Sequence, residues 1–138
     1  IYVQQSWLNG FVVLDPKTRE QRTDNLPDLG KEVPMPEFYP QNVNHGIGLN
    51  PDESELWCNS TALEFVAVYT HPGLEHVANI PVGKEPNAVA FSSDGRYAYI
   101  SNRKSDNLSI IDTKTHKEIK RLSLGKYPQR MVIIDVPD

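Results

Sequence analysis

The chain has 138 residues, of which 14 are basic and 18 acidic, giving a net charge of −4. This length suits one domain, and the acidic balance disfavours a general nucleic-acid or anionic-membrane binder, which needs a basic surface. No apolar run reaches membrane-spanning length. Cys58 is the single cysteine, so no disulfide forms within the chain, and cysteine usage does not indicate the compartment.

The N-terminal part of the chain predicts three short strands over about residues 1–24, the first of them in IYVQQ at the very start. The following segment, about residues 24–44, has four prolines and little periodicity. That composition predicts an ordered, semi-rigid loop rather than a strand. Long loops in compact folds often carry function, although a neutral surface insertion explains the segment equally well.

Two units of four strands follow, over about residues 45–82 and 87–124, and one apolar strand is expected at about 129–136. In the second unit, Ser92-Ser93-Asp94-Gly95 predicts a hairpin turn, because Gly adopts positive φ and Asp accepts hydrogen bonds from turn N–H groups. The four strands of this unit are expected at about 87–92, 96–102, 107–113 and 117–123.

The units repeat with a fixed 42-residue step, which lays GIGLNPDESELWCNS (46–60) on AVAFSSDGRYAYISN (88–102). A Gly-Lys-x-Pro turn recurs at the same step, at residues 83–86 and 125–128. The first unit matches the third at a 97-residue offset, so the step from the first unit to the second is longer than the regular one. Four antiparallel strands every 40-odd residues are typical of a β-propeller, one unit per blade, with the Gly-Lys-x-Pro turn as the crossover between blades.

The segments AYISN, LWCNS and IYVQQ, with IIDTKT and VLDPKT after the first and last, resemble the YVTN-type propeller repeat. The resemblance covers nearly the whole chain except the segment around 24–44. It implies a parent ring of seven blades and a periplasmic, secreted or cell-surface protein, although this chain shows no signal peptide. Similar repeats occur in lactonase-like proteins, bacterial surface proteins and propellers with quinone or haem chemistry, so the resemblance indicates fold more sharply than function.

Three blades cannot close a ring, because propellers close with about four to eight. Two arrangements would cover the open faces and the edge of the first strand. In the favoured one, the chain is the C-terminal part of a longer ring, with further blades before Ile1. In the other, two copies form six blades, and the 129–136 strand of one copy completes the first blade of the next.

His45, Asn87 and Gln129 occupy one equivalent position at the 42-residue step, where each inner strand is expected to enter the central channel. One interpretation is that they hydrogen-bond inter-blade turns; the other is that they form a ligand-binding or catalytic ring. His45 is the only one of the three that titrates near neutral pH, so it is the candidate catalytic residue if the protein is an enzyme. No other His, Asp or Glu accompanies it at metal-ligand spacing, so no metal site is predicted.

Further residues are expected on the same face. Arg103, Lys104, Arg130 and Trp7 would suit an anionic or carbohydrate ligand, although ordinary solvated loop residues are an alternative explanation. Phe38 and Tyr39, in the 24–44 loop, are expected to cap the channel.

The favoured function is a non-catalytic scaffold that binds a small molecule, glycan or protein at the channel mouth. The alternative is a propeller enzyme, either a lactonase-like hydrolase or lyase that uses His45, or a quinone- or haem-linked oxidoreductase. No cofactor and no nucleic-acid partner are predicted. An enzyme should pair His45 with an acid, whereas a scaffold should engage it with backbone carbonyls.

Overall fold

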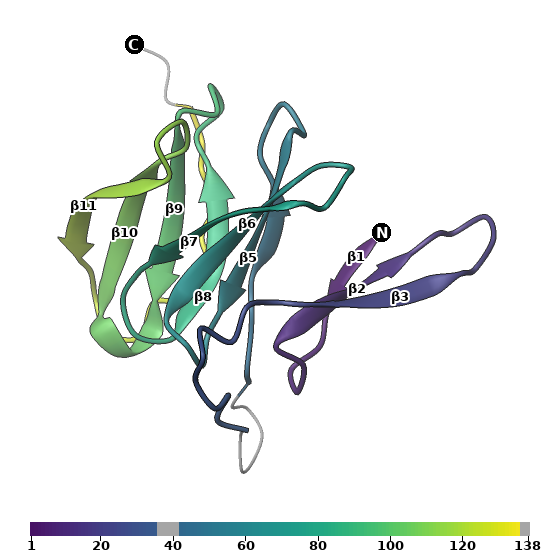
Figure 1. The fold of residues 1–138 in the computed structure, drawn as a ribbon. Helices are drawn as coiled ribbons and strands as arrows, with labels where there is room; N and C mark the ends of the chain where they lie inside the picture. Colours follow the sequence, from purple (N-terminus) through teal and green to yellow (C-terminus); the bar gives the residue numbers. More distant parts are fainter. Residues whose placement is uncertain (36–41, 136–138) are drawn as a thin grey trace.

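The computed structural model describes residues 1–35 and 42–135, which form three separate antiparallel sheets. The sheets stand side by side like sectors of an incomplete wheel (Figure 1). Within the described ranges there is no α-helix, and hence none long and apolar enough to cross a membrane. The expected all-β fold is confirmed as an open, partial propeller.

Each sheet is one blade, and its strands pair in chain order, so every connection within a blade is a hairpin. Blade 1 has three strands: β1 (Tyr2–Gln4), β2 (Gly10–Leu14) and β3 (Gln21–Asn25). Blade 2 has four strands: β4 (Ile47–Leu49), β5 (Glu55–Ser60), β6 (Phe65–Thr70) and β7 (His76–Pro81). Blade 3 also has four strands, each within a residue of its expected bounds: β8 (Pro86–Phe91), β9 (Tyr97–Asn102), β10 (Asn107–Asp112) and β11 (Lys117–Ser123).

Blade 2 is covered on both faces, which explains why β5 and β6 are buried at nearly every position and why β6 is almost wholly apolar. On β6, Phe65, Ala67 and Tyr69 belong to the core shared with blade 1, whereas Val66 and Val68 belong to the core shared with blade 3. Successive side chains of a strand point to opposite faces, so one continuous apolar run fills both interfaces. Full burial of a side chain as large as Val or Phe stabilises the fold by about 1.5–3 kcal/mol.

Cys58 lies on β5 in the core between blades 1 and 2, where it is fully buried as a free thiol. Burial raises the pKa of this thiol, so it stays protonated at neutral pH. Cys58 therefore serves as a small core residue.

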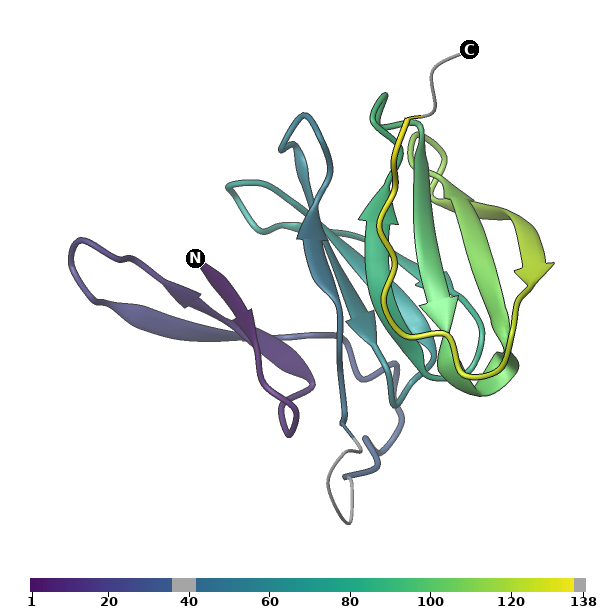
Figure 2. The same ribbon diagram turned by 180° about the vertical axis from the view of Figure 1, so that it is seen from behind.

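The C-terminal segment differs from the expectation. Residues 129–135 form no strand, so the strand predicted at 129–136 is wrong over its described part. The segment runs along blade 3 (Figure 2), where Ser101 Oγ donates to Gln129 O over 2.8 Å and Ser93 Oγ donates to Asp135 Oδ1 over 2.9 Å. A strand requires a hydrogen-bonded ladder, and no other described backbone segment offers this one a ladder.

Candidate functional site

The loops that lead into successive blades meet at one end of the sheets. This is the lower end in Figure 1, where the β1–β2 loop and the 3-10 turn η1 (Arg103–Ser105) also lie. A pocket of about 250 Å³ opens there, and we call it the mouth pocket. It is lined by Ser6, Asn42, His45, Asn87, Arg103, Tyr127, Gln129 and Arg130.

The mouth pocket brings together five of the nine residues predicted for the channel mouth, His45, Asn87, Arg103, Gln129 and Arg130. Three of them hold the equivalent entry position of successive units. The 42-residue step thus corresponds in space to side chains around one pocket.

The remaining predicted residues are not in this pocket. Lys104 is exposed, and its Nζ lies 2.5 Å from Glu85 Oε1. Trp7 is 54% exposed and does not line the mouth pocket. Phe38 and Tyr39 lie outside the described residues, so their capping role stays a prediction.

Ser6, Asn42 and Tyr127 line the pocket although the sequence pattern does not single them out. A signal existed for Tyr127, because it is the x residue of the second Gly-Lys-x-Pro turn, equivalent to Glu85 in the first. A signal existed for Ser6 as well, because it is equivalent to Arg103 at the 97-residue offset between the first and third units. Asn42 lies outside the aligned repeat segments, so the periodic pattern gave no reason to choose it.

His45 is exposed at the pocket, and its Nδ1 donates to the backbone carbonyl of Asn87 over 2.7 Å. This bond joins the entry of blade 2 to the entry of blade 3. Gly46 has φ +96°, and a Cβ on it would collide with the same Asn87 carbonyl, so this close approach requires glycine. The His-Gly pair therefore has a structural explanation. Among the described residues, no carboxylate contacts His45.

Arg103 is 6% exposed and is the most buried charge at the pocket. Its Nη2 lies 3.2 Å from Glu85 Oε2, which is close enough for an ion pair. The two groups are not aligned for a hydrogen bond, because Glu85 Oε2 has no hydrogen-bond partner among the described residues. Arg103 Nε is likewise buried without a partner there. The guanidinium also lies 5.3 Å from the centroid of the Tyr127 ring. Glu85 and Tyr127 thus hold Arg103 between two successive crossover turns.

Arg130 is exposed, and no carboxylate pairs with it among the described residues. The charge of Glu85 is shared by Arg103 and Lys104. With two arginines and no acidic residue among the lining side chains, the mouth pocket carries positive charge.

A second pocket, of about 360 Å³, adjoins the mouth pocket and shares Ser6 and His45 with it. We call it the amide pocket, because three of its side chains are carboxamides. Its lining is Gln4, Gln5, Ser6, Asn44, His45, Gly46 and Ile47. Asn44 Nδ2 donates to the Gly10 carbonyl. Asn44 Oδ1 and Gln4 Nε2 are buried and have no hydrogen-bond partner among the described residues.

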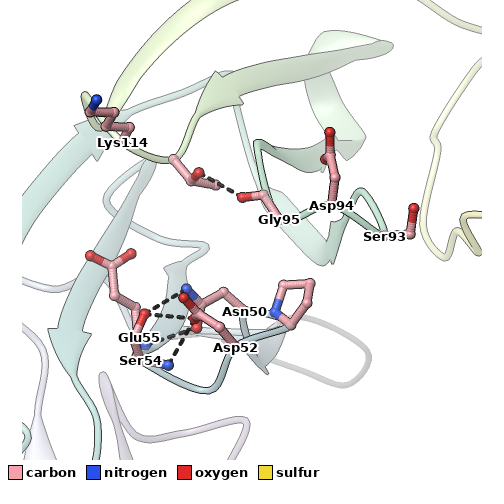
Figure 3. A pocket seen from close by; sticks show the side chains of 10 residues that line it. Asn50, Asp52, Ser54, Glu55, Ser93, Asp94, Gly95 and Lys114 are labelled. Atoms are coloured by element: carbon pink, nitrogen blue, oxygen red, sulfur yellow. Dashed lines mark hydrogen bonds between the residues drawn. The ribbon is translucent and has the colours of Figure 1, made fainter.

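The opposite end of blades 2 and 3 has a third pocket, of about 440 Å³, which we call the turn pocket (Figure 3). Its two aspartates, Asp52 and Asp94, stabilise hairpin turns. Asp52 accepts from the Ser54 hydroxyl and N–H, and Asp94 accepts from the Ser92 hydroxyl and the Arg96 N–H. These hydrogen bonds lower the pKa of both carboxyls, the hydroxyl contributing most in each case.

No cluster of three or more His, Cys, Asp or Glu side chains suited to a metal ion occurs in residues 1–35 and 42–135.

No protein-family model and no curated protein matches the sequence. Solved β-propeller structures do match the fold. The periplasmic gluconolactonase PpgL of Pseudomonas aeruginosa is 19% identical, with a TM-score of 0.76 over 99% of this chain and 39% of that one. Dihydro-haem d1 dehydrogenase NirN is 20% identical, with a TM-score of 0.67 over 91% of this chain and 25% of that one.

Hydrazine synthase of Kuenenia stuttgartiensis is 27% identical, with a TM-score of 0.61 over 62% of this chain and 24% of that one. The chain therefore spans between about a quarter and two fifths of the length of these structures. At these levels of identity and coverage, the likeness defines a class, the β-propellers.

Proposed function

We propose that the chain is part of a larger β-propeller that serves as a non-catalytic binding scaffold, with the mouth pocket as its recognition surface. The observation that carries this proposal is the convergence of His45, Asn87 and Gln129, from three blade entries, with Arg103 and Arg130 around one pocket. The bond from His45 to a backbone carbonyl, and not to a carboxylate, supports a structural role for that residue. The ligand is a small molecule, a glycan or a protein segment.

The wider setting belongs to the same proposal. The repeat is of the YVTN type, and further blades of a parent chain, or a second copy, complete a ring around the channel. The protein acts in the periplasm or outside the cell. The YVTN resemblance supports this location, as does the similarity to PpgL, whose name describes it as periplasmic.

The second candidate function is a propeller enzyme, and one observation favours it. PpgL is described as a gluconolactonase, and its structural likeness extends over 99% of this chain. In that case His45 would serve as the general acid or base, with Nε2 as its reactive atom because Nδ1 is engaged by Asn87 O. A quinone- or haem-linked oxidoreductase belongs to the same alternative.

One kinetic experiment on the 138-residue chain separates the two functions. Hydrolysis of glucono-δ-lactone is followed in a pH-stat for the wild type and for His45→Ala, with spontaneous hydrolysis subtracted. We expect no acceleration by either protein, because no described acid orients His45. Acceleration by the wild type that His45→Ala abolishes, with an unchanged circular dichroism spectrum, would replace the scaffold by the enzyme.

A binding experiment tests the scaffold directly. Glycans and small polar metabolites are screened for an increase in Tm of the wild type, and each hit is repeated with Gln129→Ala, which alters the mouth pocket. Lys114→Ala is the matched control, because it alters the turn pocket at the other end and makes no contact with the segment 129–135 that carries Gln129. We expect at least one hit whose shift depends on Gln129 and not on Lys114. A screen without any such hit contradicts the binding function.

A further inference from the structure

We propose that the mouth pocket and the amide pocket together bind one small organic anion, with its carboxylate or phosphate at Arg103 and Arg130 and its hydroxylated body in the amide pocket. This inference rests on the proposed binding function and specifies the ligand class. It follows from the contrast in charge and hydrogen-bonding capacity between two cavities that share Ser6 and His45.

The cationic half is pre-formed. Arg103 is held between Glu85 and the Tyr127 ring, so its guanidinium loses little side-chain entropy when it binds an anion. Arg130 adds a second charge that no described carboxylate neutralises. Two guanidinium groups around a pocket of about 250 Å³ fit a carboxylate or phosphate oxygen set.

The amide pocket, which is the neutral half of the site, suits a ligand that carries hydroxyl groups. Asn44 Oδ1 is an unpartnered acceptor, and Gln4 Nε2 is an unpartnered donor, in terms of the described residues, and both side chains line the amide pocket. A hydroxyl group both donates and accepts a hydrogen bond, so it can satisfy an acceptor and a donor of this kind. A hydrocarbon body would leave both atoms as they are in the free chain, so it would not gain the roughly 0.5–1.5 kcal/mol that each new hydrogen bond to a hydroxyl contributes. An acidic group in the body would find no arginine or lysine in this pocket.

The test uses four linear six-carbon probes that separate the charge from the hydroxyl groups: mannonate, mannitol 1-phosphate, mannitol and hexanoate. Binding to the 138-residue chain is measured at low salt by titration with ¹⁵N–¹H NMR, and the shifted amides locate the site. We expect mannonate or mannitol 1-phosphate, according to which anion the pocket prefers, to bind about tenfold or more tightly than mannitol and hexanoate.

Two variants with matched controls assign the two halves. Arg130→Gln should weaken binding of the preferred anion about tenfold, whereas Arg121→Gln removes the same charge from β11 and should leave binding within about twofold. Gln4→Met should weaken that anion about threefold to tenfold and leave hexanoate unchanged. Gln21→Met on β3 is its control. Arg103→Gln is informative only if it folds, so Arg130 carries the test.

The outcomes distinguish this inference from the function on which it rests. If mannitol binds at the mouth as tightly as both anions, or if Arg130→Gln has no effect, the anion assignment is wrong while mouth binding stands. The same holds if none of the four probes binds but an uncharged glycan from the screen does. If no ligand of any kind shifts the mouth amides, both proposals fail.

Discussion

The two ends of the blades use polar side chains in opposite ways. At the turn pocket, Asp52 and Asp94 accept hydrogen bonds from their own hairpins, so these carboxylates help to shape the chain that carries them. At the channel mouth, Arg103 Nε, Asn44 Oδ1 and Gln4 Nε2 have no hydrogen-bond partner among the described residues. Pocket volume is therefore a poor guide to function here, because the turn pocket is larger, yet its carboxylates are already satisfied.

The strongest effect should come from the core that both ends share. Trp57 is fully buried between blades 2 and 3, its ring lies edge-on to Phe91 at 5.6 Å, and its Nε1 donates to Glu55. Trp57→Ala should lower the free energy of unfolding by about 3–5 kcal/mol, measured by urea denaturation followed by circular dichroism. Trp7→Ala, at an exposed site, should stay within about 0.5 kcal/mol. Equal effects of the two substitutions would contradict the blade 2–blade 3 core.

The next largest effect on the free energy of unfolding should distinguish Gly83 from Gly125, which hold equivalent positions in the repeat. A Cβ on Gly83 would lie 2.7 Å from Asn102 Cβ, and Asn102 cannot move away, because it is fully buried and donates to Asn107 and Ser109. Gly83→Ala should therefore destabilise the chain by about 1–3 kcal/mol.

Gly125 holds the equivalent place in the next crossover, and a Cβ added to it would have nothing within 4 Å, so Gly125→Ala serves as the matched control. It should change the free energy of unfolding by less than about 0.5 kcal/mol. Thermal or urea denaturation of both variants decides the matter. A similar loss in both would mean that backbone conformation, and not packing against Asn102, makes glycine necessary at the crossover.

The smallest expected effect is on the pH dependence of stability, and it comes from the aspartates of the turn pocket alone. The pKa values of Asp52 and Asp94 are lower in the folded chain than their ordinary value of 3.8, so the unfolded chain takes up these protons first as the pH falls. The stabilisation is thus complete above the ordinary pKa and is lost as the pH falls towards the lowered one. The urea midpoint of the wild type should decline between about pH 5 and pH 3, and that of a D52N/D94N double variant should decline less.

The same double variant also tests whether the two ends are independent, because it should leave ligand binding at the mouth unchanged at pH 7. Identical pH profiles for wild type and variant would show that the turn hydrogen bonds do not discriminate between the charged and neutral carboxyl. A loss of mouth binding would show that the two ends are coupled through the interface.

The sequence predicted the blades well, because strand length, turn residues and the crossover recur at the 42-residue step. It also predicted that Asn87 and Gln129 would lie near His45, since equivalent positions of radial blades surround one axis. Both successes come from information that is local or periodic.

The rest depends on contacts between units, which a periodic pattern does not contain. Asn42 joins the site through the course of the long inter-blade segment. The pairing of Arg103 with Glu85 and Tyr127 joins positions in two different crossovers. The segment 129–135 has strand-like residues but no ladder, because strand formation depends on a neighbouring backbone as well as on the residues themselves.

The x position of the Gly-Lys-x-Pro crossover turns can accept different side chains beside Arg103. Glu85 and Tyr127 hold the same place in two Gly-Lys-x-Pro turns, both have positive φ (50° and 56°), and both side chains touch Arg103. The surrounding turn sets the backbone there, while the side chain is free of the hydrophobic cores. Evolution can therefore exchange an acid for an aromatic at this place, and retune the charge presented to a ligand, while the architecture of the wheel is inherited intact.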